Sequence, residues 1–357
     1  MKGNKGEWSE IYTFLKISAE GVLFGGDENL NKIDHIFYPV LSIIREEQTN
    51  NYYYNQEDTT VRVVKDDGTE VLSVDKAIFG QKSKELLDIL VHSSGRSFEF
   101  PSIEEFLEEV NVSRLKSDSS NKRDITIKVH DLSTHSEPTL GFSIKSRLGG
   151  SSTLLNPGEA TNFIYEVQHI NNDIIDQINS IQTRSKIKDR VKFLTNSKTT
   201  TKFKKIESSN FQLNLQMIDT LLPEMLGIML FYYYGGLATK LRDLVDLLEE
   251  KNPLQFDQSS NHRFYEYKIK NFLTDVALGM TPQRGWTGVY DATGGYIVVK
   301  EDGEIVCYHI YNRNEFQEYL LNHTYLDTPS STRYNFGKAF GECDKVYIKL
   351  NLQIRFM

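Results

Sequence analysis

Hydrophobic positions near the start of the chain recur at helical spacing. Trp8, Ile11, Tyr12 and Leu15 fall on one helical face, and Gly21 follows the end of the pattern. This spacing predicts a helix that buries one face and ends at the glycine. We therefore expect an amphipathic helix here rather than the charged and then apolar leader of a secreted protein.

Short apolar runs separated by polar turns come next, and they are typical of strands. Residues 35–44 and 59–74 predict strands, with a hairpin turn at the "DDGT" of the second segment. Residues 81–94 and 102–112 carry apolar positions at helical spacing and predict two helices. Helices and strands thus alternate irregularly, which predicts a mixed α/β fold.

The second half of the chain also mixes the two patterns. A Gly- and Ser-rich segment at 146–163 predicts irregular structure, and 166–194 predicts helix. Two apolar or amphipathic segments, 217–236 and 237–250, predict core helices. The last third predicts strands, two around "EDGE" within 287–311 and one long final strand at 345–356.

Composition narrows the class of protein. The 357 residues are enough for one large core or two domains, and 39% hydrophobic with 25% charged residues is ordinary for a globular protein. Cys307 and Cys343 lie far apart without metal-binding spacing, which predicts no zinc site and no disulfide framework. The longest apolar run, 221–234, is too short to span a bilayer. We therefore expect a cytoplasmic protein without a membrane partner.

An acid and a lysine lie at the two ends of the strand–turn–strand segment RDITIKVHDLSTHSEPTLGFSIKS. Alternation places Asp124 on the polar face of the first strand, and Ser143 and Lys145 on the polar face of the return strand. With the turn centred near Thr134, Asp124 is expected opposite Ile144. A carboxylate can hold Mg²⁺, and a lysine can orient or deprotonate a metal-activated water or stabilise a phosphate. The hairpin is therefore a candidate site for phosphodiester hydrolysis, although a surface salt bridge has the same spacing.

Asp131 is the rival acid in this hairpin. It lies where the first strand meets the turn, where Asp is common for turn-forming reasons alone, and its parity places it with the apolar face. We therefore prefer Asp124. His130 shares the polar face and either assists proton transfer or is simply hydrogen-bonded to a neighbour.

The order of Asp, strand, acid with turn, and apolar-x-apolar-x-Lys resembles the core of the PD-(D/E)xK nucleases. The segments MKGNKGEWSE, GGDENLNKI, GFSIKSRLGGSSTLLNPGEATNF and YIKLNLQIRF together resemble the HpaII family of type II restriction endonucleases, over residues 2–356. The resemblance implies Mg²⁺-dependent cleavage of double-stranded DNA within CCGG, with 5′-phosphate and 3′-hydroxyl ends.

The same resemblance bears on partners. It implies restriction–modification, with a cognate DNA methyltransferase in the same cell as a functional rather than a physical partner. A palindromic site is cut by a symmetric dimer or by one subunit acting twice, and we expect a homodimer.

One position departs from the general nuclease pattern. Ser143 stands where Asp or Glu normally precedes x-Lys, so the hairpin lacks its second acidic metal ligand. Either Ser143 binds the metal weakly through water, or another carboxylate takes part. Glu10, at the edge of the buried face of the first helix, is the preferred candidate; Glu7 is the alternative, although an acid in the first turn already stabilises the helix dipole. The resemblance adds the main-chain carbonyl of Ile144 as a ligand.

Basic residues are concentrated between residues 184 and 205, in a chain with a formal net charge of −8. Against one acid, Asp189, this stretch holds nine basic residues: Arg184, Lys186, Lys188, Arg190, Lys192, Lys198, Lys202, Lys204 and Lys205. Such a local excess neutralises DNA phosphates and makes binding salt-dependent. We expect the stretch to contact DNA rather than to form an ordinary solvated face.

Polar residues after the hairpin lysine are expected beside the bound duplex. They are Arg147, Ser152, Thr153 and Asn156. Reading a G·C pair in the major groove calls for Arg or Lys against guanine, which makes Arg147 and Arg284 candidates for base contacts. The loop around Arg284, TPQRGWTGVYD, is either a recognition loop or a packed turn.

The predicted organisation is a PD-(D/E)xK nuclease core with DNA-contacting insertions in residues 1–215, completed by a C-terminal α+β DNA clamp in residues 216–357. The boundary between them is open, and a single domain is the alternative. Two rival functions also remain at this point. One is a structure-directed nuclease of the same fold, and the other is a non-catalytic, sequence-specific DNA-binding protein, which the missing acid at Ser143 favours.

Overall fold

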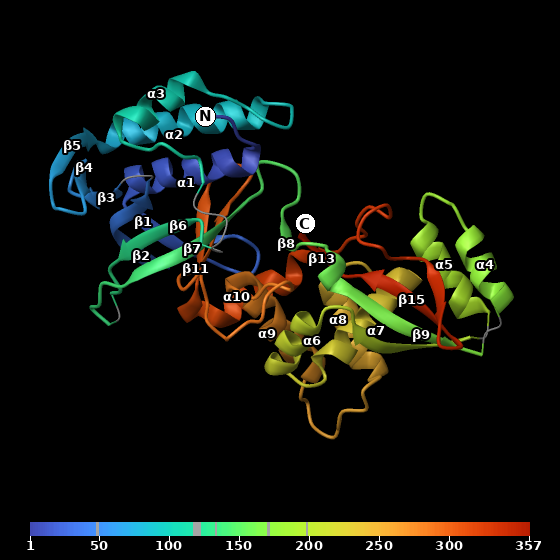
Figure 1. The fold of residues 1–357 in the computed structure, drawn as a ribbon. Coiled ribbons are helices and arrows are strands. Elements are labelled where there is room, and N and C mark those ends of the chain that lie inside the picture. Colours follow the sequence, from blue (N-terminus) through green and yellow to red (C-terminus); the bar gives the residue numbers. More distant parts are fainter. Residues whose placement is uncertain (48–49, 117–122, 133, 170–171, 198) are drawn as a thin grey trace. The chain divides into compact units, whose positions relative to one another are not determined.

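The protein divides into two compact units in a computed structural model (Figure 1). The structure describes residues 1–357 except 48–49, 117–122, 133, 170–171 and 198. We define unit 1 as Met1–Ser152 with Tyr290–Tyr319, and unit 2 as Thr153–Val289 with Leu320–Met357. Both units contain helices and strands, so the predicted mixed α/β class is confirmed. The predicted boundary after residue 215 divides the chain by role, and it stays a prediction.

Unit 1 is built on one large sheet and the helices that pack on it. Its elements are α1 (Lys5–Glu20), β1 (Val22–Gly26), β2 (Lys32–Glu46), β3 (Asn51–Gln56), β4 (Thr60–Lys65), β5 (Glu70–Asp75), α2 (Lys76–His92), α3 (Pro101–Glu109), β6 (Ile125–Val129), β7 (Thr139–Ser146), β11 (Gly295–Val299), β12 (Ile305–His309), a short 3-10 helix (Ile310–Asn312) and the start of α10 (Arg313–Asn322). The predicted opening helix and the hairpins around "DDGT" and "EDGE" are confirmed.

The sheet of unit 1 has nine strands in the order β1-β12-β11-β7-β6-β2-β3-β4-β5. Strand β1 also pairs with β2, so the six strands β1, β12, β11, β7, β6 and β2 form a closed ring of hydrogen-bonded neighbours. The pairs β11–β7 and β1–β12 are parallel, whereas the other pairs are antiparallel. Segments from far along the chain, β11 and β12, therefore lie directly beside the β6–β7 hairpin.

Helix α1 is the centre of the hydrophobic core of unit 1. Phe14 on α1 meets Tyr54 on β3 edge to face, and also Phe79 on α2, which in turn meets Phe106 on α3. The helix is thus sandwiched between the sheet and the layer of α2 and α3 (Figure 1). Gly21 ends α1 in the left-handed conformation, at φ 64°, as the spacing predicts.

Unit 2 combines two small sheets with a cluster of helices. Its elements are β8 (Thr153–Leu155), a short 3-10 helix (Glu159–Thr161), β9 (Asn162–Gln168), α4 (Asn172–Ser180), α5 (Lys186–Asn196), β10 (Thr200–Ile206), α6 (Ser209–Ile218), α7 (Leu222–Gly235), α8 (Leu241–Lys251), α9 (Phe264–Leu278), β13 (Thr324–Leu326), β14 (Ala339–Glu342), β15 (Lys345–Asn351), β16 (Ile354–Phe356) and the end of α10. The sheets are ordered β10-β9-β15-β14 and β13-β16-β8.

Several predicted elements of this half are wrong in extent. The helix predicted over 166–194 begins as the end of β9, because Phe163, Tyr165 and Val167 alternate into the sheet core. The segment predicted to be irregular contains β8, the short 3-10 helix and the start of β9 (Asn162 and Phe163). The long final strand is two strands, β15 and β16, which pair in different sheets.

The apolar run in unit 2 is a buried helix, α7, with Met225, Leu226, Met229 and Leu230 fully buried. Among the described residues no single helix is long and apolar enough to span a membrane; α6 and α7 reach that length only together, across a bend of 108°.

Candidate active site

Helix α1 carries Glu10 to the end of β7. Asn4 caps the helix, with its side chain and that of Glu7 bonded to each other's backbone amides. One turn later, the hydroxyl of Ser9 donates to the hydroxyl of Ser146 at 2.8 Å. This bond fixes the helix against the last residue of β7, and Glu10 follows Ser9 directly.

The β6–β7 hairpin places Asp124 one position away from the predicted register. Ile125 pairs with Phe142, and the amide of Asp124 donates to the carbonyl of Phe142 at 2.8 Å. Asp124 therefore lies beside Phe142 and Ser143, and the prediction that it lies opposite Ile144 is wrong. The turn is not centred on Thr134, because Asp131 and Ser136 form the last bridge of the hairpin.

Two consecutive residues of β7, Ser143 and Ile144, hold the carboxylate of Asp124. Its Oδ2 accepts the hydroxyl proton of Ser143 at 3.0 Å and the amide proton of Ile144 at 2.6 Å. Ser143 is buried, with 2% of its surface exposed. The serine that replaces the usual acid is thus a hydrogen-bond donor to the remaining one.

Glu10 is a partly buried carboxyl group close to Asp124. Burial, and then the negative charge of Asp124, raises the pKa of Glu10 to about 8, while the charges of Arg45 and Lys145 oppose this rise. The Oε2 atom of Glu10 is buried and has no hydrogen-bond partner among the described residues. Two carboxylates and a lysine therefore meet here, and one buried oxygen is left for a further cationic or hydrogen-bonding group.

Lys145 and Glu10 line the same cavity. It has a volume of about 410 Å³, and Ile144, Ser146 and Ser152 line it too. Gly95 and Gly150 leave parts of its wall without side chains, and Lys5 and Arg96 add positive charge. Such a cavity suits an anionic group that approaches the carboxylates.

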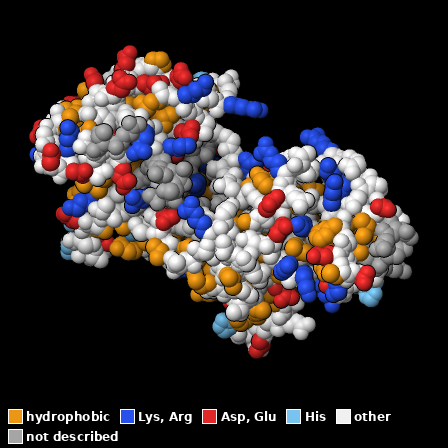
Figure 2. All heavy atoms as spheres, viewed as in Figure 1, with side chains coloured by type: hydrophobic (Ala, Val, Ile, Leu, Met, Phe, Trp, Pro, Cys, Tyr) orange, Lys and Arg blue, Asp and Glu red, His pale blue; other side chains and the backbone are white. Residues whose placement is uncertain are grey.

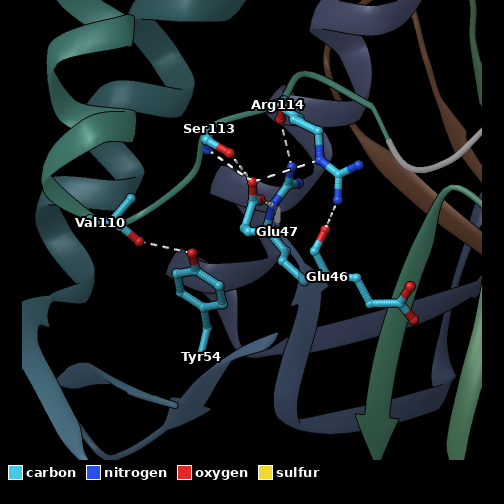
Figure 3. A network of polar contacts seen from close by, with 7 residues as sticks. Glu46, Glu47, Tyr54, Val110, Ser113 and Arg114 are labelled. Atoms are coloured by element: carbon cyan, nitrogen blue, oxygen red, sulfur yellow. Dashed lines mark hydrogen bonds and ion pairs between the residues drawn. The ribbon is translucent and has the colours of Figure 1, made fainter. Parts of the chain in front are cut away.

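A network of ion pairs supports Arg45, the other cation near Glu10. Its Nε donates to Glu47 at 3.0 Å and its Nη2 to the carbonyl of Arg114 at 2.6 Å. Figure 3 shows that the carboxylate of Glu47 accepts hydrogen bonds from the amide and hydroxyl of Ser113. The guanidinium of Arg114 donates to the carbonyl of Glu46. These bonds connect the segment after α3 to the end of β2. The guanidinium of Arg45 is therefore fixed rather than mobile.

The residues at this site fit a hard divalent cation. Carboxylate and main-chain carbonyl oxygens are the ligands that Mg²⁺ prefers, and the unpartnered Oε2 of Glu10 beside Asp124 is an oxygen of this kind. Among the residues that the structure describes, no group of three or more His, Cys, Asp and Glu side chains is arranged to hold a metal. Mg²⁺ suits such a sparse site, since it retains several waters and binds substrate phosphates.

The alternative candidates from the sequence, Asp131, His130 and Glu7, make contacts elsewhere. Asp131 is at the opposite end of β6, about 20 Å along the strand from Asp124, and it accepts the amide of Thr134 in the turn. His130 lies next to it, with its amide bonded to Pro39. Glu7 pairs with Lys116 at 2.8 Å, and that hydrogen bond lowers its pKa. Asp124 and Glu10 are therefore the two acids that the fold brings together near Lys145.

The predicted DNA-contacting residues are divided between the units. In unit 1, Arg147 lies 3.8 Å from Glu301, and Ser152 lines the cavity. In unit 2, Thr153 begins β8, Asn156 follows β8, and Arg284 is exposed in the loop before residue 290.

Arg190 requires a correction. Only 2% of it is exposed, and its guanidinium donates to the carbonyls of Gly337, Asn179 and Ile181 at 2.6 to 3.1 Å. A guanidinium engaged in this way supports the packing of α5 and is withdrawn from the predicted phosphate contacts. Lys186 is half-buried, and Lys188 lies over the ring of Tyr233 at 4.3 Å.

The exposed part of the basic stretch extends from α5 onto β10. Arg184, Lys192, Lys202, Lys204 and Lys205 are exposed, whereas Lys198 lies outside the described residues. Strand β10 is at the edge of its sheet, and its three lysines are exposed. Figure 2 shows Lys and Arg side chains over the face of unit 2 in that view.

Comparison with known proteins places the chain in a family. The model of the HpaII restriction endonuclease family matches residues 4–356. The chain belongs to the HpaII restriction endonuclease family. It is 45% identical over 356 residues to the type II restriction enzyme HpaII of Haemophilus parainfluenzae, which covers 99% of this chain and 98% of that protein. No solved structure matches it.

Membership confirms the resemblance seen in the sequence and the prediction of an endonuclease. This HpaII family protein is a type II restriction endonuclease, a site-specific deoxyribonuclease whose substrate is double-stranded DNA. Enzymes of this type generally need a divalent metal ion. The non-catalytic and structure-directed alternatives are thereby set aside.

Two residues near the site were not found from the sequence. Tyr296, on β11, lies under Lys145, with the Nζ atom 5.3 Å from the ring centroid. Arg45, on β2, acts on Glu10 through its charge. Neither has a motif around it, because each reaches the site through strand pairings and a salt-bridge network that link distant segments.

Proposed function

We propose that this HpaII family enzyme uses Mg²⁺ to hydrolyse DNA at the palindrome CCGG, and that Glu10, Asp124 and Lys145 form its active centre. The observation that carries the proposal is that Glu10, which has an unpartnered buried oxygen and feels the charge of Asp124, lines one cavity together with Lys145. CCGG is inferred from the family resemblance and from likeness to the enzyme HpaII. The fold around the site is proposed to be a PD-(D/E)xK core, with the β6–β7 hairpin as its motif.

Each residue has a distinct proposed role. Glu10, Asp124 and the carbonyl of Ile144 would hold the metal, which when bound supplies a Lewis acid for the phosphate and lowers the pKa of water. Lys145 orients and helps to deprotonate the attacking water, and its charge offsets the charge that builds on the phosphate. In-line attack on phosphorus then leaves a 5′-phosphate and a 3′-hydroxyl. Ser143 holds Asp124 rather than the metal.

DNA binding is proposed to use both units. Arg147 and Ser152 lie near the cavity, and Thr153, Asn156 and Arg284 belong to unit 2. The exposed lysines of α5 and β10, with Lys186 and Lys188, are proposed to neutralise phosphates. Residues 216–357 would complete the grip on the duplex. We also propose a homodimer on the palindrome and a cytoplasmic location beside a cognate methyltransferase, since a restriction enzyme is tolerated only where host DNA is protected.

A Mg²⁺-dependent digest of a sequenced plasmid tests this proposal. The wild type is compared with Asp124→Ala, Lys145→Ala and, as the matched control, Asp131→Ala. We expect discrete fragments that end at CCGG, at least about a thousandfold slower cleavage in Asp124→Ala, and a similar loss in Lys145→Ala. DNA binding with Ca²⁺ in place of Mg²⁺ should survive in both variants.

The results test the proposed metal ligand and the proposed recognition sequence separately. Cleavage that survives in Asp124→Ala but not in Asp131→Ala would overturn the proposed metal ligand. Fragments that end at another sequence would leave the active centre intact and refute CCGG.

A further inference from the structure

We propose that the loop formed by residues 281–286 reads base pairs of the target through the side chains of Gln283 and Arg284, and that Asn214 is the positioning residue of this loop. The inference rests on the proposed function, because it takes the target to be a short palindrome of G·C pairs. Of the two interpretations that the sequence leaves open for this segment, a recognition loop is thereby preferred to a packed turn.

Asn214, on helix α6, fixes both ends of the loop. Its side chain is buried, with 3% of the residue exposed, and its Nδ2 donates to the carbonyls of Thr281 at 3.1 Å and Arg284 at 2.8 Å. Its Oδ1 accepts the amide proton of Trp286 at 2.8 Å. Carbonyls only accept and a main-chain amide only donates, so the orientation of the side-chain amide is determined. One buried side chain thus closes the loop with three hydrogen bonds.

Two more side chains at the start of α6 hold the middle of the loop. The hydroxyl of Ser208, the N-cap of the helix, donates to the carbonyl of Pro282 at 3.4 Å. The Nδ2 of Asn210 donates to the carbonyl of Gln283 at 3.1 Å. Side chains from one short segment therefore hold all four consecutive carbonyls of residues 281–284. A loop held in this way is ordered before DNA arrives, so binding does not have to supply the cost of ordering it.

The same hydrogen bonds use the backbone and leave the side chains at the tip of the loop in solvent. Gln283, Arg284 and Gly285 are all exposed. Apart from its chain neighbours, no atom of the described residues lies within 4 Å of the place where a Cβ on Gly285 would be. The loop therefore presents an amide and a guanidinium, one after the other, at an uncovered surface.

The segment around Asn156 lies beside this loop in unit 2. A Cβ on Gly158 would be 3.7 Å from Nε2 of Gln283, and the carbonyl of Gly158 accepts from Nδ2 of Asn351 at 2.7 Å. Asn351 is fully buried, so this segment is also fixed from inside the unit. Two segments that are far apart in the sequence, each with polar side chains expected to contact DNA, are thus neighbours.

Gln283 and Arg284 have the chemistry that a G·C pair requires. In the major groove guanine offers O6 and N7 as acceptors, which match two N–H groups of a guanidinium, and cytosine offers its N4 amine, which an amide oxygen accepts. Such contacts discriminate between bases only when their support is rigid, because a mobile support lets them shift to other partners. Asn214 therefore acts on discrimination between sequences rather than on affinity for phosphate.

The test measures affinity for a duplex that contains CCGG and for duplexes in which one base pair of this site is replaced. Ca²⁺ takes the place of Mg²⁺, so that the DNA is not cut. The variants are Arg284→Ala, Gln283→Ala, Asn214→Asp, and the double variant of Arg284→Ala with Asn214→Asp. Aspartate keeps an oxygen for the amide of Trp286 and loses the donor to the two carbonyls. The readouts are the ratio of the two affinities and the slope of log affinity against log salt.

The two main variants have matched controls in unit 2. Arg184→Ala also removes an exposed arginine, but from the basic stretch, where phosphate contact is expected. Asn179→Asp makes the same change of charge as Asn214→Asp. It removes a similar bond elsewhere, from Nδ2 to the carbonyl of Ala339 at 2.9 Å.

We expect Arg284→Ala to lower the affinity for CCGG at least about tenfold and the affinity for the substituted duplexes less than about twofold. Asn214→Asp should lower the ratio about fivefold at an unchanged salt slope, and its effect should not add to that of Arg284→Ala. Gln283→Ala should lower the ratio less than Arg284→Ala. Arg184→Ala should weaken both affinities equally and reduce the salt slope by about one, whereas Asn179→Asp should keep the wild-type ratio.

Two results would overturn the inference. If Arg284→Ala weakens both affinities equally, as expected of Arg184→Ala, then Arg284 contacts phosphate and the loop does not read bases. If Asn214→Asp keeps the wild-type ratio, Asn214 is not the positioning residue. Should Asn214→Asp fail to fold, Asn210→Ala takes its place, since Asn210 is exposed and also holds the loop.

Failure of the proposed function would look different. A wild type that binds CCGG no better than the substituted duplexes would refute the proposed recognition sequence. A wild type that does not cut with Mg²⁺ would refute the proposed catalysis.

Discussion

The two units of the protein differ in charge, although they belong to one DNA-cutting enzyme. Unit 1 has 20 Lys and Arg against 31 Asp and Glu, a formal net charge of −11, whereas unit 2 has 21 against 18, a net charge of +3. The unit that holds the proposed catalytic carboxylates thus repels a polyanion, and the other attracts it. The net charge of −8 is therefore the sum of an acidic unit and a basic unit, which we expect to have different roles on DNA.

The units also use their cations differently. In unit 1, Arg45 is held inside the protein by Glu47, and Lys145 lies over the ring of Tyr296, so each acts at one place. In unit 2, the lysines of β10 are exposed at a sheet edge. Fixed cations suit the chemistry of one phosphate, and exposed cations suit attraction along a duplex.

The substitution Glu10→Gln in unit 1 is expected to have the largest effect, which is on the cleavage rate. Loss of the second carboxylate should slow single-turnover cleavage roughly a hundredfold at low Mg²⁺, with partial recovery as Mg²⁺ is raised. The measurement is a Mg²⁺ titration of the cleavage rate at saturating DNA.

Glu7→Gln is the matched control, one turn earlier on the same helix. Its carboxylate pairs with Lys116 and caps the helix, so the variant should cleave at nearly the wild-type rate. The reverse result, with a slow Glu7→Gln and a fast Glu10→Gln, would exchange their roles.

A smaller effect is expected from a fall in pH, which should reduce the folding stability of unit 1. Burial lowers the pKa of His309 to about 4, and its Nδ1 accepts the amide of Tyr311. The pKa in the folded state is below the unfolded value of about 6.5, so the unfolded state binds more protons as pH falls through this window. Stability should therefore decline on acidification, by about 2 kcal/mol from this residue between pH 7 and pH 5.

Urea unfolding at the two pH values checks this expectation. His309→Gln should show a correspondingly smaller loss of stability on acidification than the wild type. His262→Gln, at an exposed position in unit 2, should retain the wild-type pH dependence. Equal pH dependence in all three proteins would show that His309 is not responsible.

The sequence was sufficient for features that depend on local pattern. The opening helix with Glu10, the hairpin with Asp124 and Lys145, and the basic stretch all follow from periodicity or composition, and the family from its segments. Register was not sufficient, because the position of Asp124 depends on where the turn closes, and the bridge of Asp131 with Ser136 moves that point.

Long-range pairing was beyond the sequence. Tyr296 reaches Ser143 only because β11, over 150 residues later, inserts parallel to β7, and no local spacing records this. The burial of an individual charged side chain could not be predicted from the sequence either. Arg190 lies in a basic helix like its neighbours, yet its side chain turns inward to three carbonyls.

The smallest expected effect, on affinity alone, tests the role of unit 2. The triple variant Lys202→Ala, Lys204→Ala, Lys205→Ala should bind DNA about tenfold more weakly near physiological salt and reduce the slope of log affinity against log salt by about three, one for each lost phosphate contact. The cleavage rate at saturating DNA should stay unchanged, because none of these lysines belongs to the proposed active centre, which lies within unit 1. Fluorescence anisotropy at several salt concentrations measures both quantities.

The matched control removes three lysines from unit 1, Lys65, Lys76 and Lys84. Their loss changes the net charge of the protein by the same amount, so a general electrostatic effect would weaken binding equally in the two triples. We expect the unit 1 triple to keep most of the wild-type salt slope. Equal slopes in the two triples would show that DNA responds to net charge alone, and the contrast between a catalytic and an attracting unit would then fail.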